Sequence, residues 1–259
     1  MMKKNRIGIL LLHGFTTTPT TFRFFIPKIE ALGIPYQAPI LYGHGAESPL
    51  ALKGVYWKEW IAQAVHELNI LSARVEKIII IGHSMGGMIA LHLAASHEKK
   101  IDSVIVAGSS PRSISIFGPG HVLNFLVPYF VKVVNKLDWH HAYSAPEYPR
   151  GEDAYKWVPT DALLQLFAIM KSTGRILRNV KLPVLILHSK VDSKNSPDGA
   201  IAMFEKLSTP KEEKKLVWFE QTDHSMFLDC EKEAVNQIVV EYVKNRMSGS
   251  EVKPAHQAG

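Results

Sequence analysis

The chain has 259 residues, of which 46% are hydrophobic and 21% are charged. This composition is typical of a globular protein, and the length suits one α/β domain that carries an insertion. The net charge of +6 comes from dispersed lysines and arginines without interleaved aromatic residues, so we expect no nucleic-acid partner. The single cysteine, Cys230, excludes a disulfide bond within the chain.

The first apolar run, residues 7–12, ends at His13-Gly14. It is too short for the core of a signal peptide or for a membrane span, and the later apolar runs are also shorter than a bilayer requires. We therefore expect a cytoplasmic protein. The polar tail at 248–259 is expected to be flexible.

Strand-like and helix-like patterns alternate along the chain. Continuous apolar runs typical of buried strands are separated by stretches with helical periodicity. In chain order we predict strand 7–12, helix 20–32, extended segment 35–39, helix 56–72, strand 77–81, helix 85–97, strand 103–107, helix 160–174, strand 183–188, helix 196–207, strand 216–219 and helix 231–246. The alternation predicts an α/β fold with a mostly parallel sheet of about six or more strands flanked by helices. Functional groups are expected at the carboxyl edge of that sheet.

The stretch 111–180 interrupts the alternation. Its apolar run 114–134 is broken by glycines and prolines, and the stretch continues to the predicted helix 160–174. We interpret it as a mainly helical cap inserted into the α/β domain. The core of that domain then consists of two segments, 1–110 and 181–247.

A serine lies in the motif Gly82-His83-Ser84-Met85-Gly86-Gly87, between a predicted strand and a predicted helix. In this context a Gly-x-Ser-x-Gly pattern is typical of a nucleophile elbow, in which the strained turn requires small neighbours. Ser84 is therefore the predicted nucleophile. The alternative is a tight glycine turn that carries a surface serine without a catalytic role.

A serine hydroxyl needs a base, and sites of this type have the chain order serine, acid, histidine. His224 follows the strand 216–219, and Asp192 follows the strand 183–188, so both are expected at the edge of the sheet where Ser84 lies. We predict His224 as the base and Asp192 as the acid. Asp198 is the alternative acid, but it follows Pro197 and is placed to cap a helix.

Acyl transfer also requires hydrogen-bond donors for the oxyanion. The candidates are the backbone N–H of Met85, directly after the predicted nucleophile, and that of Phe15, in the loop after the first strand. The alternative for His13-Gly14-Phe15 is a plain turn. His44, in Tyr42-Gly43-His44-Gly45, is either a structural residue or an acid–base group, and the structural interpretation is favoured.

These motifs, in this order, resemble the α/β-hydrolase superfamily, with the closest likeness to bacterial carboxylesterases and monoacylglycerol lipases. The likeness covers residues 7–111 and 183–246. It rests on the motifs Leu12-His13-Gly14-Phe15-Thr16, Tyr42-Gly43-His44-Gly45, Trp57-Lys58-Glu59-Trp60 and Gly82-His83-Ser84-Met85-Gly86-Gly87, together with Asp192 and His224. The resemblance implies the same triad and the same oxyanion donors. The acid loop, Val191-Asp192-Ser193-Lys194-Asn195, departs from the usual Asp followed by an apolar pair, which leaves the substrate open.

We expect a serine hydrolase that cleaves carboxylic esters through an acyl-enzyme on Ser84, without a metal or another cofactor. The substrate would be a small ester or a lipid-like molecule. Its acyl chain would contact apolar side chains of the cap, namely Phe117, Phe125, Leu126 and Phe130, and the cap would touch lipid surfaces transiently. The alternative is that these side chains only pack the cap onto the core.

The same triad is compatible with other chemistry. C–C bond hydrolases, amidases, peptidases and acyltransferases use such groups, and a fold does not choose among them. A non-catalytic protein that binds a small molecule on a hydrolase scaffold is a further alternative. The oligomeric state is left open by the sequence.

Overall fold

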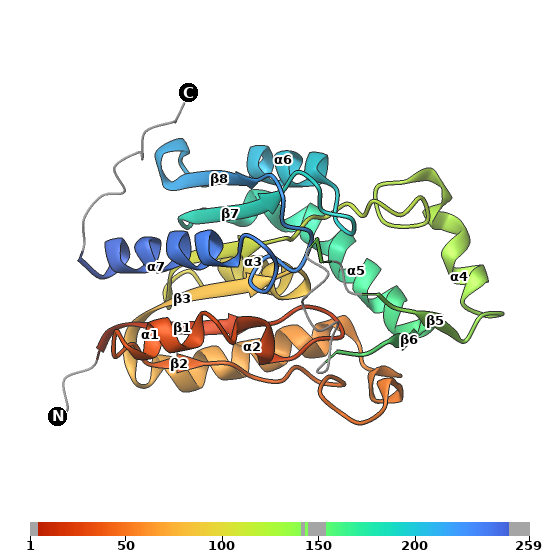
Figure 1. Cartoon of the computed structure of the whole chain (residues 1–259), viewed down its shortest axis with the longest axis horizontal. Coiled ribbons are helices and arrows are strands. Elements are labelled where there is room, and N and C mark those ends of the chain that lie inside the picture. The colour runs from red at the N-terminus through yellow and green to blue at the C-terminus, as the bar shows by residue number, and fades with distance from the viewer. Residues whose placement is uncertain (1–4, 141–142, 145–153, 249–259) are drawn as a thin grey trace.

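The computed structural model describes residues 5–140, 143–144 and 154–248. Its centre is a six-stranded parallel sheet with the strand order β2-β1-β3-β4-β7-β8 (Figure 1). The strands are β1 (Asn5–Leu12), β2 (Tyr36–Gln37), β3 (Val75–His83), β4 (Ile101–Ala107), β7 (Val184–Ser189) and β8 (Lys214–Phe219). The predicted parallel α/β sheet is confirmed.

Helices cover both faces of this sheet, because successive side chains of a buried strand point to opposite faces. The helices of the α/β core are α1 (Ile26–Glu30), α2 (Trp57–Ser72), α3 (Met85–Ser96), α6 (Pro197–Lys206) and α7 (Lys232–Ser248), with short 3-10 turns η1 (Pro19–Phe22), η2 (Pro49–Leu52) and η5 (Lys211–Glu213). One apolar core joins alternate strand residues to α2, α3 and α6, and a second joins the others to α1 and α7.

Helix α2 shows how the local sequence sets an element. The Glu59 side chain accepts a hydrogen bond from the Tyr56 N–H at 2.7 Å, which satisfies a backbone donor at the start of the helix. Its inner face contains Trp60, which is fully buried and donates its indole N–H to the Tyr42 carbonyl at 3.0 Å. This contact holds the loop after β2 against the helix.

The predicted helix 20–32 is wrong as a single element. The structure has η1 and α1 there, separated by a turn. The Thr18 hydroxyl caps η1 by accepting a hydrogen bond from the Thr20 N–H at 3.3 Å. Pro27 lies in the first turn of α1. A proline has no N–H for an intrahelical bond, so it is tolerated at a helix start but interrupts a continuous helix.

The segment between β4 and β7, which we call the insertion, forms η3 (Val122–Leu126), α4 (Val127–Phe130), β5 (Lys136–Asp138), β6 (Trp157–Pro159), α5 (Thr160–Ile176) and η4 (Leu177–Asn179). The antiparallel pair β5–β6 was not expected in a mainly helical cap. Figure 1 shows α4, β5 and β6 at the end of the molecule opposite the last turns of α7. Residues 145–153 of the insertion and the expected tail at 249–259 lie outside the described residues.

The root of the insertion is tied to the loop after β7. Ser113 and Asn195 form an antiparallel bridge, the Ile114 N–H donates to the Lys194 carbonyl at 3.0 Å, and the Ser196 N–H donates to the Arg112 carbonyl at 3.0 Å. Farther along, buried residues of α5 pack into the same core as α3. The insertion therefore starts in direct contact with the carboxyl edge of the sheet.

Candidate active site

Ser84 occupies a sharp turn between β3 and α3, with backbone angles φ of 52° and ψ of −117°. A positive φ is unfavourable for a residue that has a Cβ atom, so surrounding contacts must hold it. The Ser84 N–H donates to the Ala107 carbonyl at 2.8 Å, and the Ser109 hydroxyl donates to the Ser84 carbonyl at 2.6 Å. Strand β4 and its following loop therefore hold the turn in place.

The glycines of the motif are required by close approach. A Cβ atom on Gly82 would lie 2.3 Å from the Gly86 carbonyl oxygen, and one on Gly86 would lie 1.9 Å from the Leu12 carbonyl oxygen. Both distances are far below van der Waals contact, and both involve backbone atoms. The start of α3 can press against β1 only because side chains are absent here.

The structure brings the predicted triad together from three loops at the carboxyl edge of the sheet. His224 Nε2 lies 2.9 Å from Ser84 Oγ, and His224 Nδ1 lies 2.9 Å from Asp192 Oδ2. Since the carboxylate can only accept, Nδ1 carries the proton and Nε2 offers its lone pair to the serine hydroxyl. This arrangement can remove a proton from Ser84.

Asp192 is 2% exposed, and its Oδ1 accepts hydrogen bonds from the Lys194 and Asn195 N–H groups, both at 2.8 Å. Burial works to raise the pKa of Asp192, but the adjacent His224 and the hydrogen bonds outweigh it, so the pKa is lowered. A second buried imidazole, that of His188, lies 3.8 Å from Asp192 Oδ2. Asp192 is therefore held as a carboxylate.

The other acidic residues near this loop have different contacts. Asp198 lies in the first turn of α6, where a carboxylate favours the helix. Asp223 accepts hydrogen bonds from the Ser193 N–H at 2.8 Å and from the Ser193 hydroxyl at 3.0 Å. It also accepts the His224 N–H at 2.6 Å, so it joins the two loops of the triad. Neither replaces Asp192 at the His224 ring.

The loop after β1 lies directly against Ser84. A Cβ atom on Gly14 would be 3.3 Å from the Ser84 Cβ, and Phe15 lines the same cavity as Ser84. Within the described part of the chain, neither the Phe15 N–H nor the Met85 N–H donates to another protein group. Both donors are thus available beside the serine hydroxyl. Their action as an oxyanion hole stays a prediction.

Two buried histidines support this loop. His13 Nε2 accepts the Leu41 N–H at 3.0 Å, so its Nδ1 carries the proton and donates to the Gly14 carbonyl at 2.8 Å. His44 Nδ1 donates to the Tyr42 carbonyl at 3.0 Å. Burial lowers the pKa of His13 to about 3 and the pKa of His44 to about 4. His44 does not line the cavity beside Ser84, which favours the structural interpretation.

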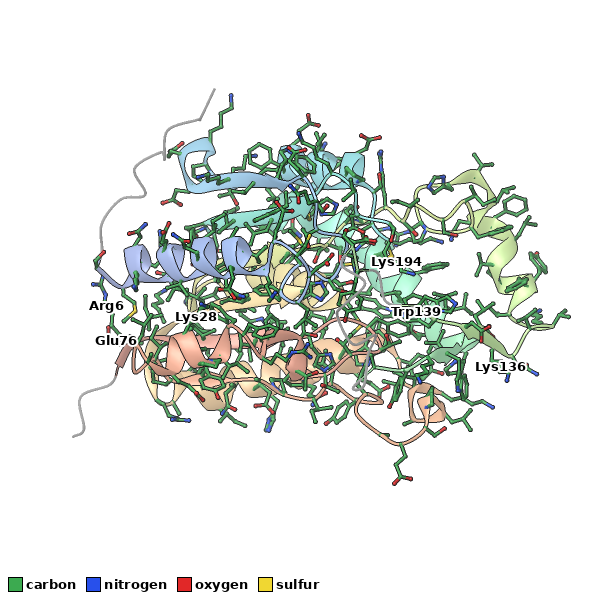
Figure 2. The ribbon with its side chains drawn as sticks, in the orientation of Figure 1. Arg6, Lys28, Glu76, Lys136, Trp139 and Lys194 are labelled. Carbon is green, nitrogen blue, oxygen red and sulfur yellow. The ribbon has the colours of Figure 1, made fainter. Side chains whose placement is uncertain are left out.

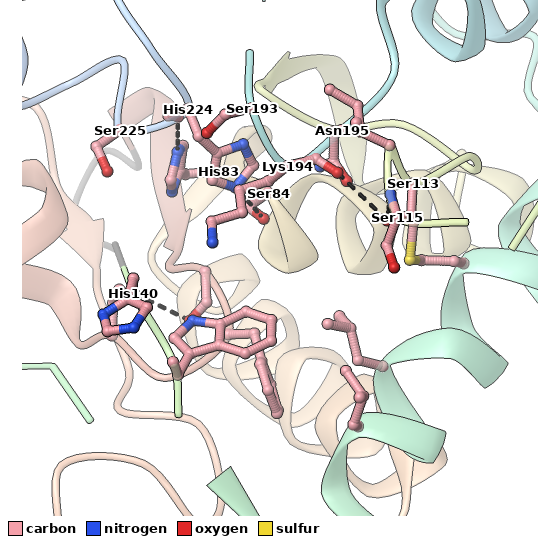
Figure 3. A pocket seen from close by; sticks show the side chains of 18 of the residues that line it. His83, Ser84, Ser113, Ser115, His140, Ser193, Lys194, Asn195, His224 and Ser225 are labelled. Carbon is pink, nitrogen blue, oxygen red and sulfur yellow. Dashed lines mark hydrogen bonds between the residues drawn. The ribbon is translucent and has the colours of Figure 1, made fainter. Parts of the chain in front are cut away.

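A cavity of about 430 Å³ opens beside Ser84 and His224 (Figure 3). One part of its wall is apolar and comes mainly from α3, α5 and the loop residues that face them, namely Phe15, Met88, Leu137, Trp139, Leu163, Leu166, Phe167 and Met170. The other part is polar and includes Ser113, Ser115, Ser193, Lys194 and Asn195. The cavity can therefore hold a molecule with one apolar arm and one polar arm.

The apolar residues predicted to bind substrate lie elsewhere in the structure. Phe117, Phe125, Leu126 and Phe130 are 46%, 63%, 38% and 46% exposed, and none of them lines the cavity. Their substrate contact stays a prediction. Sequence reasoning missed the apolar wall on α5, although the spacing of Leu163, Leu166, Phe167 and Met170 is that of one helix face.

Metal binding and membrane crossing each need a distinct arrangement of residues. Within residues 5–140, 143–144 and 154–248, no group of three or more His, Cys, Asp or Glu side chains is placed to hold a metal ion. In the same ranges, none of the helices combines the length and the apolar character that a membrane crossing requires.

Comparisons with known proteins agree with the α/β fold. The chain is 27% identical over 237 residues to a thermostable monoacylglycerol lipase of Bacillus sp. (strain H-257), covering 91% of this chain and 90% of that protein. It is 23% identical to a carboxylesterase of Bacillus subtilis (strain 168), with 92% of each chain covered. A solved structure from work on the metagenome-derived lipolytic enzymes LipS and LipT superposes with a TM-score of 0.84 at 24% identity, covering 93% of this chain and 95% of that one. The model of the alpha/beta hydrolase family matches residues 9–238, so the chain belongs to the alpha/beta hydrolase family.

Proposed function

We propose that the protein is a serine hydrolase of carboxylic esters that works through an acyl-enzyme on Ser84. The observation that carries this proposal is the hydrogen-bonded series Ser84–His224–Asp192 at the wall of a cavity. The monoacylglycerol lipase and the carboxylesterase to which the chain is similar support ester hydrolysis over the other reactions of such a triad.

In the first half of the reaction, His224 Nε2 takes the hydroxyl proton as Ser84 Oγ attacks the ester carbonyl. The new C–O bond converts the carbonyl oxygen into an oxyanion, which the Phe15 and Met85 N–H groups would bind. Asp192 stabilises the imidazolium while the charge exists. Collapse of the intermediate breaks the ester bond, and His224 gives its proton to the leaving alcohol.

In the second half, water takes the place of the alcohol. His224 removes a proton from the water as its oxygen attacks the acyl-enzyme, and the same N–H groups bind the second oxyanion. Collapse breaks the bond to Ser84 Oγ, which regains its proton from His224. The products are a carboxylic acid and the free enzyme, and no cofactor is consumed.

The shape of the cavity supports a small ester or lipid-like substrate. An acyl chain would lie along the apolar wall on α5, where Leu166, Phe167 and Met170 face Met88 of α3. Burial of each methylene contributes about 0.8 kcal/mol, so several contacts would favour medium or long chains over acetate.

We infer that the insertion, residues 111–180, acts as a cap on a core made of residues 1–110 and 181–247. The single cysteine suits a cytoplasmic location.

The test is hydrolysis of nitrophenyl esters of increasing chain length by the wild type and by Ser84→Ala. We expect turnover that favours octanoate over acetate in the wild type, and a loss of about 10⁴-fold or more in kcat for Ser84→Ala. Asp198→Asn serves as a matched control, since this carboxylate lies outside the triad and should leave kcat unchanged.

A fluorophosphonate probe separates the possible failures. Labelling of the wild type but not of Ser84→Ala, without turnover of any ester, would show a reactive serine that serves another acyl or C–C bond reaction. Full esterase activity in Ser84→Ala would contradict the nucleophile assignment itself. Absence of both labelling and turnover would favour a non-catalytic binding protein.

We also propose that the outer part of the insertion touches lipid surfaces. Large apolar side chains lie exposed along η3, α4 and their flanking turns, namely Ile116, Phe117, Val122, Phe125, Leu126, Tyr129, Phe130 and Val133. Lys132 and Lys136 lie beside them and over the aromatic rings of Tyr129 and Trp157. An exposed apolar patch with adjacent lysines is suited to an anionic lipid interface.

A further inference from the structure

Lys194 reaches the cavity from the loop that carries Asp192. Among the described residues that line the cavity, it is the only lysine or arginine. Its ammonium nitrogen lies 5.4 Å from the centre of the Trp139 ring, which belongs to the stretch after β5. Figure 2 shows Lys194 and Trp139 near the junction between the sheet and the insertion, whereas Lys136 lies farther out. A positive charge therefore stands at the cavity wall that Ser84 shares.

This charge is only partly compensated. In the described part of the chain, no carboxylate lies at ion-pair distance from the Lys194 ammonium group, and the group makes no hydrogen bond to the protein. Burial lowers the pKa of Lys194, although Asp223 and Asp192 act in the opposite direction. The Trp139 ring supplies a cation–π contact, which is weaker than a hydrogen-bonded ion pair. An anion in the cavity would complete the set of partners.

The backbone of Lys194 is fixed on both sides. Its N–H donates to Asp192 Oδ1 at 2.8 Å, and its carbonyl accepts the Ile114 N–H at 3.0 Å. The Ser113 hydroxyl donates to the same carbonyl at 3.4 Å. The fixed backbone holds the start of the lysine side chain at the cavity wall, and the Trp139 contact restricts its ammonium end.

We propose that Lys194 selects esters that carry an anionic group, a carboxylate or a phosphate, on the arm that occupies the polar part of the cavity. This inference rests on the proposed function, since it names the substrate class of the same site. The apolar arm would lie along α5, the ester carbonyl at Ser84, and the anion at the Lys194 ammonium group (Figure 3).

One carboxylate, that of Asp138, also lines the cavity and would repel an anionic substrate. This residue, at the end of β5, is exposed. Solvent and salt screen an exposed charge more than a half-buried one. The charge of Asp138 is therefore screened more strongly than that of Lys194.

The experiment compares two matched pairs of substrates. The first pair is nitrophenyl octanoate and the nitrophenyl half-ester of octanedioic acid, which places a carboxylate on the acyl arm. The second is octanoylglycerol and octanoylglycerol phosphate, which places a phosphate on the alcohol arm. For each pair, the ratio of kcat/KM for the anionic ester to that for the neutral ester is measured, and the pair with the higher ratio identifies the arm that meets Lys194.

Three variants test the residue. We expect Lys194→Met to lower the ratio by about tenfold or more, because a hydrogen bond to a charged group is lost, while neutral esters change less than about threefold. Lys194→Arg should keep most of the ratio. The control is Lys190→Met, on the same loop but exposed and paired with Glu220 at 2.6 Å, which should leave the ratio unchanged. Added salt should lower the ratio in the wild type.

Two results would overturn the inference. An unchanged ratio in Lys194→Met for both pairs would show that no anion binds there, and an equal loss on neutral and anionic esters would show a structural role for Lys194. Turnover of the neutral esters tests the proposed function separately. If the wild type cleaves neither member of either pair, the proposed function fails and this inference fails with it.

Discussion

Among the glycines of the serine motif, Gly86 leaves the least space for a side chain. A Cβ atom there would lie 1.9 Å from the Leu12 carbonyl oxygen, and neither backbone can withdraw without moving β1 or α3. We predict that Gly86→Ala lowers the unfolding free energy by about 2 kcal/mol or more and removes activity, since overpacking also displaces Ser84. Urea unfolding and ester hydrolysis measure the two effects.

The matched control is Gly174→Ala, near the end of α5. Its nearest atom to a new Cβ would be the Pro111 Cβ at 3.5 Å, an ordinary contact. Alanine is favoured over glycine within a helix by about 0.5–1 kcal/mol, so this variant should be neutral or more stable. Equal stability of both variants would contradict the steric argument for Gly86.

At the residue level, local sequence was sufficient to predict that Ser84, Asp192 and His224 lie together at one edge of the sheet. Each follows a strand that could be predicted, and parallel strands bring such loops to one edge. Lys194 and His188 were not predicted. Their relation to the cavity or to Asp192 depends on how distant segments such as the Trp139 stretch pack, and no short pattern encodes that.

At the level of elements, η3 and α4 are rich in large apolar side chains that do not pack into the core. Phe125 and Phe130 are 63% and 46% exposed. We predict that Phe125→Ser combined with Phe130→Ser lowers the rate on emulsified long-chain monoacylglycerol by about tenfold, because interfacial binding scales with buried apolar area. The rate on a soluble short-chain ester should stay the same.

Ile201→Ser is the control for this element, because Ile201 is 41% exposed on α6 and lies outside η3 and α4. It should leave both rates unchanged. Binding to vesicles that contain anionic lipid, measured by flotation, reports the contact directly. Equal rates on the emulsion for the double variant and the wild type would contradict the lipid-surface proposal.

Elements with strong periodicity were predicted well, and irregular ones were not. Helix α2 agrees with its predicted range within one residue, since its buried face repeats regularly. The pair β5–β6 joins only three residues of each strand across a long connection, so neither strand shows an alternating pattern of its own. Prolines explain the short helices, as Pro27 lies in the first turn of α1 and Pro128 in that of α4.

For the whole molecule, buried neutral histidines couple stability to pH. The pKa of His44 falls from 6.5 to about 4 on folding, mainly through burial, so the unfolded chain takes up a proton first as the pH decreases. The contribution of neutral His44 to the unfolding free energy is therefore fully present above pH 6.5, and it is lost as the pH falls toward 4. We predict a contribution from His44 of about 2 kcal/mol between about pH 7 and about pH 5.

The measurement is the unfolding free energy in urea at both pH values, for the wild type and for His44→Phe. Phenylalanine suits a site bordered by the rings of Phe15 and Trp60 but cannot take up a proton. The variant should be less stable at neutral pH, because the hydrogen bonds from His44 Nδ1 to the Leu41 and Tyr42 carbonyls are lost, while each carbonyl keeps one other donor. Its loss of stability on acidification should be smaller than that of the wild type. The same pH dependence in both proteins would contradict the assignment.

The global fold was accessible from sequence because each buried strand is a continuous apolar run, and the alternation with helices leaves few topologies. The strand order follows those rules. The position of the insertion over the sheet was not accessible, because it depends on the hydrogen bonds between residues 112–114 and the loop after β7. These bonds join segments that are distant in sequence.

That connection also restricts how the molecule can deform. Ser113 and Ile114 share backbone bonds with Lys194 and Asn195, whose N–H groups hold the Asp192 carboxylate. Rotation of the insertion about this root would displace the loop that holds Asp192 and disturb the hydrogen bond between Asp192 and His224. An active enzyme therefore keeps residues 113 and 114 in place beside the acid loop, and these bonds tie the geometry of the triad to the root of the insertion.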